Sequence, residues 1–236
     1  MVCMRVTYIH HSGFLVETKH FYYLFDYESG ELPTLDIEKP IYVLSSHSHS
    51  DHYNSDIFKI LKKLEMKHIK AILSDDIEIP KDIDTLHVCA NQCYELSTNV
   101  KLRTYKSTDL GVAFLLEENG KLIYHAGDLN DWVWDEESEA YNQQMTMDYR
   151  QEIKQLARDL NYRKIDIAFV VLYPRQEYDY DKGICYFMEQ ISSKAVYPMH
   201  YWNQPGIIDK FLKEYPQYIH QIQKTETQKG GMNDEI

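Results

Sequence analysis

Hydrophobic positions gather in short runs along the chain, and polar loops separate these runs. Most runs contain β-branched and aromatic residues and end at a turn signal, which is typical of β-strands. Four other segments have apolar residues three and four positions apart, a spacing that predicts amphipathic helices. The predicted strands cover residues 4–18, 20–28, 41–46, 70–74, 85–90, 100–105, 111–128 (as a hairpin), 165–174 and 195–200. The predicted helices cover residues 54–64, 140–160, 184–191 and 206–215.

Turn and cap residues mark the ends of several of these elements. Asn54 or Ser55 is the expected N-cap of the first helix, and Asn119-Gly120 is the strongest hairpin turn in the chain. Strands dominate the early part of the sequence and later alternate with helices. This order predicts an α/β fold in which helices cover sheets that pack on each other.

A single domain is expected over residues 1–222, followed by a flexible tail over residues 223–236. No internal repeat or low-complexity tract interrupts the first part, whereas the tail turns polar and contains glycine. The chain has 236 residues, of which 44% are hydrophobic and 26% are charged, so it can bury a substantial core.

Charge and cysteine content narrow the choice of partners and compartment. The formal net charge of −12 repels phosphate backbones, so nucleic acid is not an expected partner, although bound metal ions can invert the field locally. The N-terminus has no long apolar segment, and we expect neither a signal peptide nor a membrane span. The four cysteines form no C-x-x-C pair, which favours reduced thiols in a cytoplasmic protein.

The loop after the strand over residues 41–46 is unusually rich in metal-binding side chains. It contains the motif H-x-H-x-D-H, which consists of His47, His49, Asp51 and His52. Imidazole nitrogens and carboxylate oxygens are ligands that suit zinc, manganese or iron. Alternation places His47 and His49 on the same side of an extended segment. Four donors in one loop are more than a single ion needs, which favours two adjacent metals.

This motif resembles the signature of the metallo-β-lactamase-fold hydrolases. Three further segments resemble that family in the same order: "YIHHSGFLVET" near the start, "IYHAGDLN" in the middle and "AVYPMHYW" near the end. The resemblance implies a four-layer αββα sandwich in which Asp128 bridges two metals and His200 is another ligand. Within the family, the chain looks like the small stand-alone group typified by L-ascorbate-6-phosphate lactonase.

The sequence departs from the family pattern at one ligand. The family supplies another histidine between the first motif and the bridging aspartate, and no histidine stands in the corresponding loop "TYKSTDLGVAF". Asp109 is the only strong metal-binding side chain there. Either Asp109 replaces the histidine, or the first site is weak and partly filled by water.

Other side chains near these motifs have two interpretations. We expect His11 and His125 to orient their neighbours by hydrogen bonds rather than to bind metal. The aromatic residues Trp132 and Trp134, with Arg175 as a partner for an anion, could line a substrate pocket. Ordinary packing and loop solvation explain these three residues equally well.

The resemblance implies a metal-dependent hydrolase that uses a metal-activated water. We expect two divalent ions, zinc or else manganese or iron, with Asp51 orienting the attacking water and accepting its proton. The expected substrate is a small anionic ester, lactone or phosphodiester. Two alternatives remain: a non-catalytic or single-metal relative with a binding or regulatory role, and an iron-dependent oxygenase.

Overall fold

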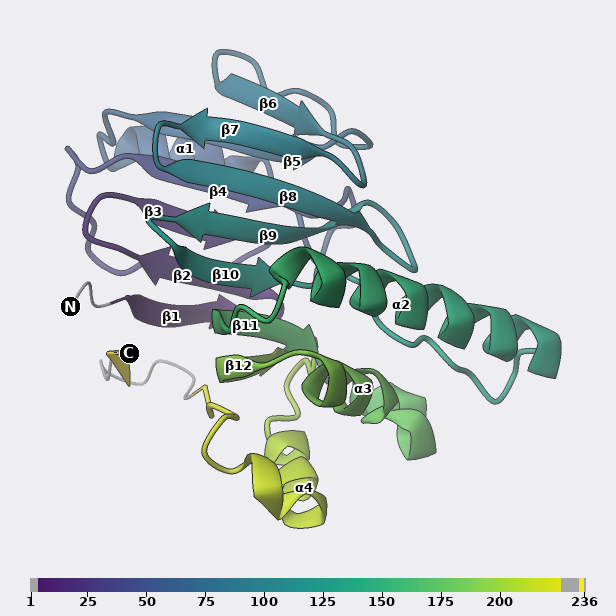
Figure 1. The fold of residues 1–236 in the computed structure, drawn as a ribbon. Helices are drawn as coiled ribbons and strands as arrows, with labels where there is room; N and C mark the ends of the chain where they lie inside the picture. Colours follow the sequence, from purple (N-terminus) through teal and green to yellow (C-terminus); the bar gives the residue numbers. More distant parts are fainter. Residues whose placement is uncertain (1–3, 226–233, 236) are drawn as a thin grey trace. The chain divides into compact units, whose positions relative to one another are not determined.

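Two sheets, each with its own helices, make up the part of the chain that the structure describes (Figure 1). The structure is a computed structural model and describes residues 4–225 and 234–235. The chain divides into two units, one of Met1–Cys89 and Thr225–Ile236 and the other of Ala90–Lys224. We call them the first and the second unit.

The sheet of the first unit has seven strands. Their bounds are β1 Arg5–His10, β2 Gly13–Glu17, β3 Tyr22–Phe25, β4 Ile41–Ser45, β5 Ile69–Ser74, β6 Asp84–Val88 and β13 Asp234–Glu235. Their order in the sheet is β13-β1-β2-β3-β4-β5-β6. The pairs β1–β2 and β2–β3 are antiparallel, whereas β3 to β6 run parallel. The helix α1 (Asp56–Lys63) connects the parallel strands β4 and β5.

The hydrophobic pattern explains these elements directly. Every residue of β4 is buried, as expected for a strand of a parallel sheet that is covered on both faces. The helix α1 turns Ile57, Phe58 and Leu61 into the core of this unit. Its first turn is capped by the side chain of Asn54, which accepts a hydrogen bond from the Asp56 N–H at 2.9 Å.

The second unit contains a six-stranded sheet, three α-helices and two short 3-10 helices. Its elements are β7 Cys93–Ser97, β8 Val100–Lys106, β9 Val112–Glu118, β10 Lys121–His125, α2 Glu139–Leu160, β11 Ile165–Val171, η1 Pro174–Asp179, α3 Lys182–Gln190, β12 Ser193–Met199, α4 Gly206–Glu214 and η2 Pro216–Tyr218. The strand order is β12-β11-β10-β9-β8-β7. The strands β7 to β10 are antiparallel neighbours, and β10, β11 and β12 run parallel.

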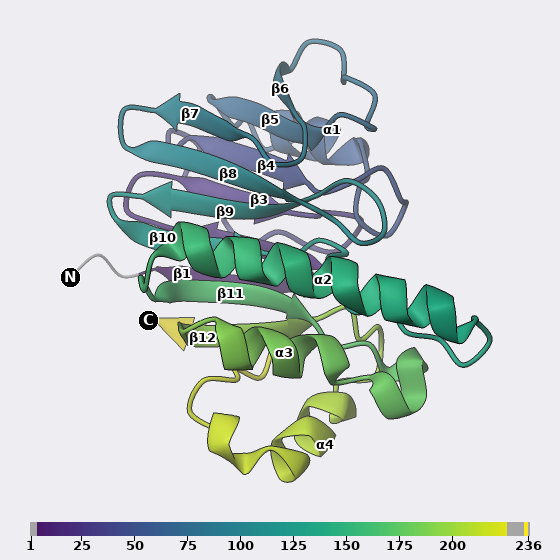
Figure 2. The ribbon, with the colours of Figure 1, turned by 45° about the vertical axis from the view of Figure 1, so that its right-hand side comes forward.

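Two helices of the second unit pack against each other. The helix α2 begins after Ser138, whose side chain accepts a hydrogen bond from the Tyr141 N–H, and it contacts α3, as Figure 2 shows. Its buried face includes Tyr149 and Ile153, one helical turn apart. The Tyr149 hydroxyl donates to the Gly183 carbonyl of α3 at 2.7 Å and fixes the contact.

The structure confirms the predicted α/β fold class. The hairpin turn lies at Asn119-Gly120, where both residues have positive φ (50° and 82°), as a tight hairpin turn requires. The strand β7 has no predicted counterpart. The predicted tail over 223–236 falls mostly outside the described residues, and the single domain over residues 1–222 stays a prediction. Within 4–225 and 234–235, no helix combines the length and apolar character needed to cross a bilayer.

Candidate metal centre

Most candidate ligands follow the C-terminal end of a strand. In the first sheet, β1, β3 and β4 point in one direction, and their ends lead into His11, Asp26 and the loop that begins at Ser46. In the second sheet, β10 and β12 lead toward Asp128 and His200. Because parallel strands end at the same edge of a sheet, each unit gathers its polar side chains at one edge.

The backbone is strained at these strand ends. The angle φ is 52° at His11, 41° at Asp26 and 66° at His200, a region that non-glycine residues rarely adopt. All three side chains are buried. Strain of this kind persists where the surrounding structure holds a residue in place, and it concentrates at functional sites.

One buried carboxylate organises the loop of the first unit. The Asp26 carboxylate accepts hydrogen bonds from the Ser46 N–H and the Ser46 hydroxyl, both at 2.7 Å. Its Oδ2 also accepts a hydrogen bond from the His52 Nδ1 at 2.7 Å. This contact places the proton of the neutral imidazole on Nδ1 and leaves Nε2 as the ligand atom of His52.

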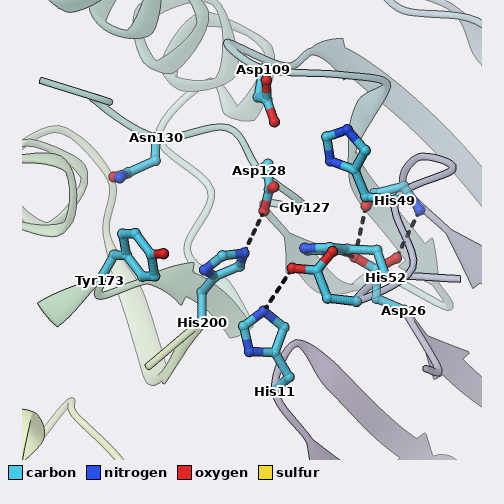
Figure 3. Close-up of polar contacts among 12 residues, drawn as sticks. His11, Asp26, His49, His52, Asp109, Gly127, Asp128, Asn130, Tyr173 and His200 are labelled. Atoms are coloured by element: carbon cyan, nitrogen blue, oxygen red, sulfur yellow. Dashed lines mark hydrogen bonds and ion pairs between the residues drawn. The ribbon is translucent and has the colours of Figure 1, made fainter. Parts of the chain in front are cut away.

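The first two histidines of the motif face each other (Figure 3 shows His49). The His47 Nε2 and the His49 Nδ1 are 3.0 Å apart. The intervening Ser48 N–H donates to the Asp76 carboxylate at 2.8 Å and anchors the loop. Burial acts to raise the pKa of Asp76, but hydrogen bonds from Ser74 and Ser48 outweigh it and hold this pKa below its usual value.

A second group of donors in the first unit consists of His11, Asp51 and His52. Their ligand atoms lie within 4.8 Å of one another. The His11 Nε2 is 3.5 Å from the Asp51 Oδ2. The Asp51 side chain keeps 28% exposure, whereas His11 and His52 are fully buried. Water can therefore reach the Asp51 carboxylate.

In the second unit, Asp128 lies close to two other candidates. Its Oδ1 is 3.2 Å from the His200 Nε2 (Figure 3), and it offers a ligand atom within 4.8 Å of one from Asp109. Gly127, which has φ of 52°, donates its N–H to the His125 Nδ1 and forms the turn that presents Asp128. The backbone carbonyl of Asp128 accepts a hydrogen bond from the Trp132 indole at 2.8 Å.

The turn that carries Asp109 is tied to the loop after Asp128. The Thr108 hydroxyl donates to the Asn130 carbonyl at 2.6 Å and accepts from the Asn130 N–H at 3.0 Å. The Gln176 side chain binds the same loop, because it accepts from the Asn130 amide and donates to the Asp131 carbonyl. These contacts fix the separation of Asp109 and Asp128.

The donors in each unit fit a divalent metal ion. Two ligands at about 2.0–2.1 Å from a tetrahedral ion lie about 3.3 Å from each other. The ligand-to-ligand distances within the units are close to this value: 3.0 Å for His47 and His49, 3.5 Å for His11 and Asp51, and 3.2 Å for Asp128 and His200. Buried imidazoles with fixed tautomers and paired carboxylates are the donors that such ions prefer.

Comparison with known families agrees with this chemistry. Residues 5–146, more than half of the 236 residues, match the family described as "Beta-lactamase superfamily domain". The chain belongs to the β-lactamase superfamily. The family assignment expected from the sequence is therefore confirmed, whereas the narrower lactonase-like group stays a prediction.

Two solved structures show the same fold. The metallo hydrolase Igni18 from Ignicoccus hospitalis superposes with a TM-score of 0.66 at 16% identity, covering 99% of this chain and 98% of Igni18. CmlA, a diiron β-hydroxylase from Streptomyces venezuelae, superposes with a TM-score of 0.62 at 10% identity, covering 99% of this chain and 54% of CmlA. These superpositions establish the metallo-β-lactamase fold.

A sequence relative extends beyond the aligned region. An RNase J-like protein from Methanocaldococcus jannaschii is 30% identical over a stretch that covers 45% of this chain. That stretch spans only 29% of the archaeal protein.

Within each unit, the structure brings together residues that sequence motifs singled out, and it adds one. Asp26 was not predicted, although it follows an apolar strand in the same way as Asp128 does. That position was the available signal. His11 was expected only to orient neighbours, and its position beside Asp51 and His52 makes it a further candidate ligand.

Proposed function

We propose that this member of the β-lactamase superfamily is a metal-dependent hydrolase with two divalent ions. The observation that carries the proposal is the set of imidazole and carboxylate donors at the sheet edge of each unit, of which His11, His47, His52, Asp128 and His200 are buried. The ligands of the first ion would be His47, His49, Asp109 and Asp128. Those of the second would be Asp51, His52, Asp128 and His200, with His11 beside them.

Bound divalent ions supply two effects: they lower the pKa of a water molecule and they stabilise negative charge on the reacting oxygen. The residues of the chain prepare this chemistry. Asp26 holds His52 in the tautomer that presents Nε2. Asp51, which remains partly open to water, orients the attacking water and accepts its proton.

The substrate class follows from the reaction type and from the field of the site. A pair of divalent cations attracts anions even in a protein of net charge −12. We therefore propose a small anionic ester, lactone or phosphodiester as the substrate. The lactonase-like group suggested by the sequence motifs is one member of this class.

A second candidate function rests on Asp109. Two carboxylates, Asp109 and Asp128, offer oxygen ligands within 4.8 Å of each other where a third histidine was expected. Oxygen donors favour manganese or iron over zinc. An iron-dependent oxygenase is the alternative, and CmlA, with the same fold, is a diiron β-hydroxylase.

Metal content and turnover test the proposal together. Protein purified without a histidine tag should contain two ions per chain and should hydrolyse chromogenic esters, lactones or phosphodiesters. His49→Ala and Asp128→Ala should each remove most of the bound metal and the activity, because each deletes a donor that no neighbour replaces. Iron with oxygen consumption would favour the alternative. Full metal occupancy in both variants would refute the site.

A further inference from the structure

All three tryptophans of the chain lie near His200, a candidate metal ligand, or near a ring that packs against it. The ring centres of Trp132 and Trp202 lie 5.7 Å and 6.4 Å from that of His200. Trp134 stacks parallel to Trp132, with ring centres 6.1 Å apart and an angle of 3° between the rings. Trp132 is buried, whereas Trp134 is half-buried and Trp202 is 38% exposed. Aromatic surface therefore remains open next to His200.

Tyr173 contacts both the tryptophan rings and the guanidinium of Arg175. Its ring is nearly perpendicular to those of Trp132 and Trp134. The ring centres of Tyr173 and His200, both labelled in Figure 3, are 5.1 Å apart. The Tyr173 hydroxyl accepts a hydrogen bond from the Arg175 Nη1 at 3.0 Å. A hydroxyl that accepts one hydrogen bond still has its own proton to donate.

In the cluster of the three tryptophans, Tyr173, His200 and Arg175, the Arg175 side chain has N–H donors that can bind a small molecule. It is exposed, and within the part of the chain that the structure describes no carboxylate lies within 4.0 Å of it. A guanidinium has five N–H donors in a planar fork that matches carboxylate and phosphate. Its bond to Tyr173 leaves most of that fork unused.

A hollow of about 260 Å³ lies beside the cluster and is lined by Trp134 and Arg175. Three carboxylates, Asp135, Glu136 and Glu177, are also on its rim. All three are exposed, so water and salt screen their repulsion of an anion. Two aligned hydrogen bonds from the Arg175 guanidinium therefore favour binding of an anion more than the screened carboxylates oppose it.

We propose that Arg175, Tyr173 and the paired tryptophans form a substrate-recognition subsite for a planar anion, an arene carboxylate or arene phosphate. The ring of the ligand stacks on Trp134, and its anionic group takes hydrogen bonds from Arg175, which the Tyr173 hydroxyl positions. The inference rests on the proposed hydrolase function, for which it names the substrate class. The scissile bond then lies on the His200 side of the cluster.

Tryptophan emission measures this subsite directly, because the chain has no tryptophan elsewhere. Benzoate and phenyl phosphate should each change the emission in a saturable way. They should bind at least tenfold more tightly than acetate and inorganic phosphate, which lack the ring, and than benzyl alcohol and benzylammonium, which lack the negative charge. The titrations use the purified protein and the same protein treated with a chelator. The comparison distinguishes anions that bind to metal from anions that bind to the subsite.

Variants assign the binding to the proposed residues. Arg175→Gln should weaken phenyl phosphate binding at least tenfold, and Arg175→Lys should have an affinity between those of Arg175→Gln and the parent. Tyr173→Phe should weaken binding less than Arg175→Gln does. Arg158→Gln is the matched control, because Arg158 is an exposed arginine near the end of α2 and should leave binding unchanged.

Several results would overturn the subsite. These are equal binding of acetate and benzoate, preference for benzylammonium, absence of saturable change, or an Arg175→Gln variant that binds like the parent. Failure of the hydrolase proposal is a separate outcome, because emission in chelator-treated protein reports binding without turnover. A protein that hydrolyses esters but shows none of this binding would keep the function and lose the subsite.

Discussion

At the residue scale, the Asp26 carboxylate determines how the histidine loop is presented. It holds both Ser46 and His52, which lie 20 and 26 positions further along the chain. All three side chains are fully buried, so no water replaces a lost contact. The local sequence around H-x-H-x-D-H predicts the ligands, but a contact over this separation depends on strand pairing and was not predictable from the motif.

Asp26→Asn should lower metal affinity about 10- to 100-fold, the usual effect of removing a group that orients a ligating histidine. The amide keeps the size of the side chain, but it loses the charge and one acceptor oxygen. A metal titration against a competing chelator measures the change. Asp84→Asn, which alters an exposed carboxylate at the edge strand of the same sheet, should have no effect. Equal affinities in the two variants would contradict the positioning role.

We propose that Asp109 decides which metal the first site prefers. Asp109→His should raise zinc affinity and move the activity optimum to lower pH, because imidazole is a softer and neutral ligand. Asp109→Ala should lower occupancy of the ion at His47 and His49 and spare the other. Asp148→Ala on the exposed face of α2 is the control. If Asp109→Ala changes neither the metal count nor the pH profile, the residue only forms its turn.

At the element scale, the hydrophobic pattern predicts a strand correctly where all of its positions are buried. The strands β4 and β11 are buried at every position and were predicted as apolar runs. The strand β7 was missed because its residues alternate between exposed and half-buried positions, so none contributes a buried apolar face. Its pairing with β8 stabilises it, and a tertiary contact of this kind is not visible in local periodicity.

The parallel strands of the second sheet are joined by an ionic contact at their N-terminal ends. The buried Asp166 on β11 accepts hydrogen bonds from Lys121 on β10 at 3.1 Å and from Lys194 on β12 at 2.6 Å. Burial acts to raise the pKa of Asp166, but hydrogen bonds from Lys194, the Leu122 N–H and Lys121 outweigh it and lower this pKa below its usual value.

Asp166→Asn should therefore destabilise the protein at neutral pH by about 2 kcal/mol, the typical value for a hydrogen bond to a charged group. A lowered pKa contributes stability that is present above the unfolded-state value near 4 and is lost as the pH falls through the folded-state pKa. Urea unfolding from pH 7 to pH 3 measures the difference, which should shrink below about pH 4. A difference that is constant with pH would show that Asp166 stabilises through packing alone.

At the scale of the whole molecule, the predicted ligands are distributed over both units. The first unit contains His47, His49, Asp51 and His52, and the second contains Asp109, Asp128 and His200. The order of motifs along the chain implied this distribution, since the resemblance assigns ligands to early and late strand ends. Composition and periodicity alone could not have done so, because they carry no information about which distant strand ends act together.

Thermal unfolding with and without metal tests whether the donors of the two units hold the same ions. Each ion at 100 times its dissociation constant should stabilise the parent by about 2.7 kcal/mol. His49→Ala and Asp128→Ala should each remove most of this gain. If the two residues share an ion, the double variant should lose no more than either single variant, which is a strong coupling. If each unit binds its own ion, each single variant should instead lose about half of the gain and the double variant all of it. The proposed dinuclear site would then be wrong even though both units bind metal.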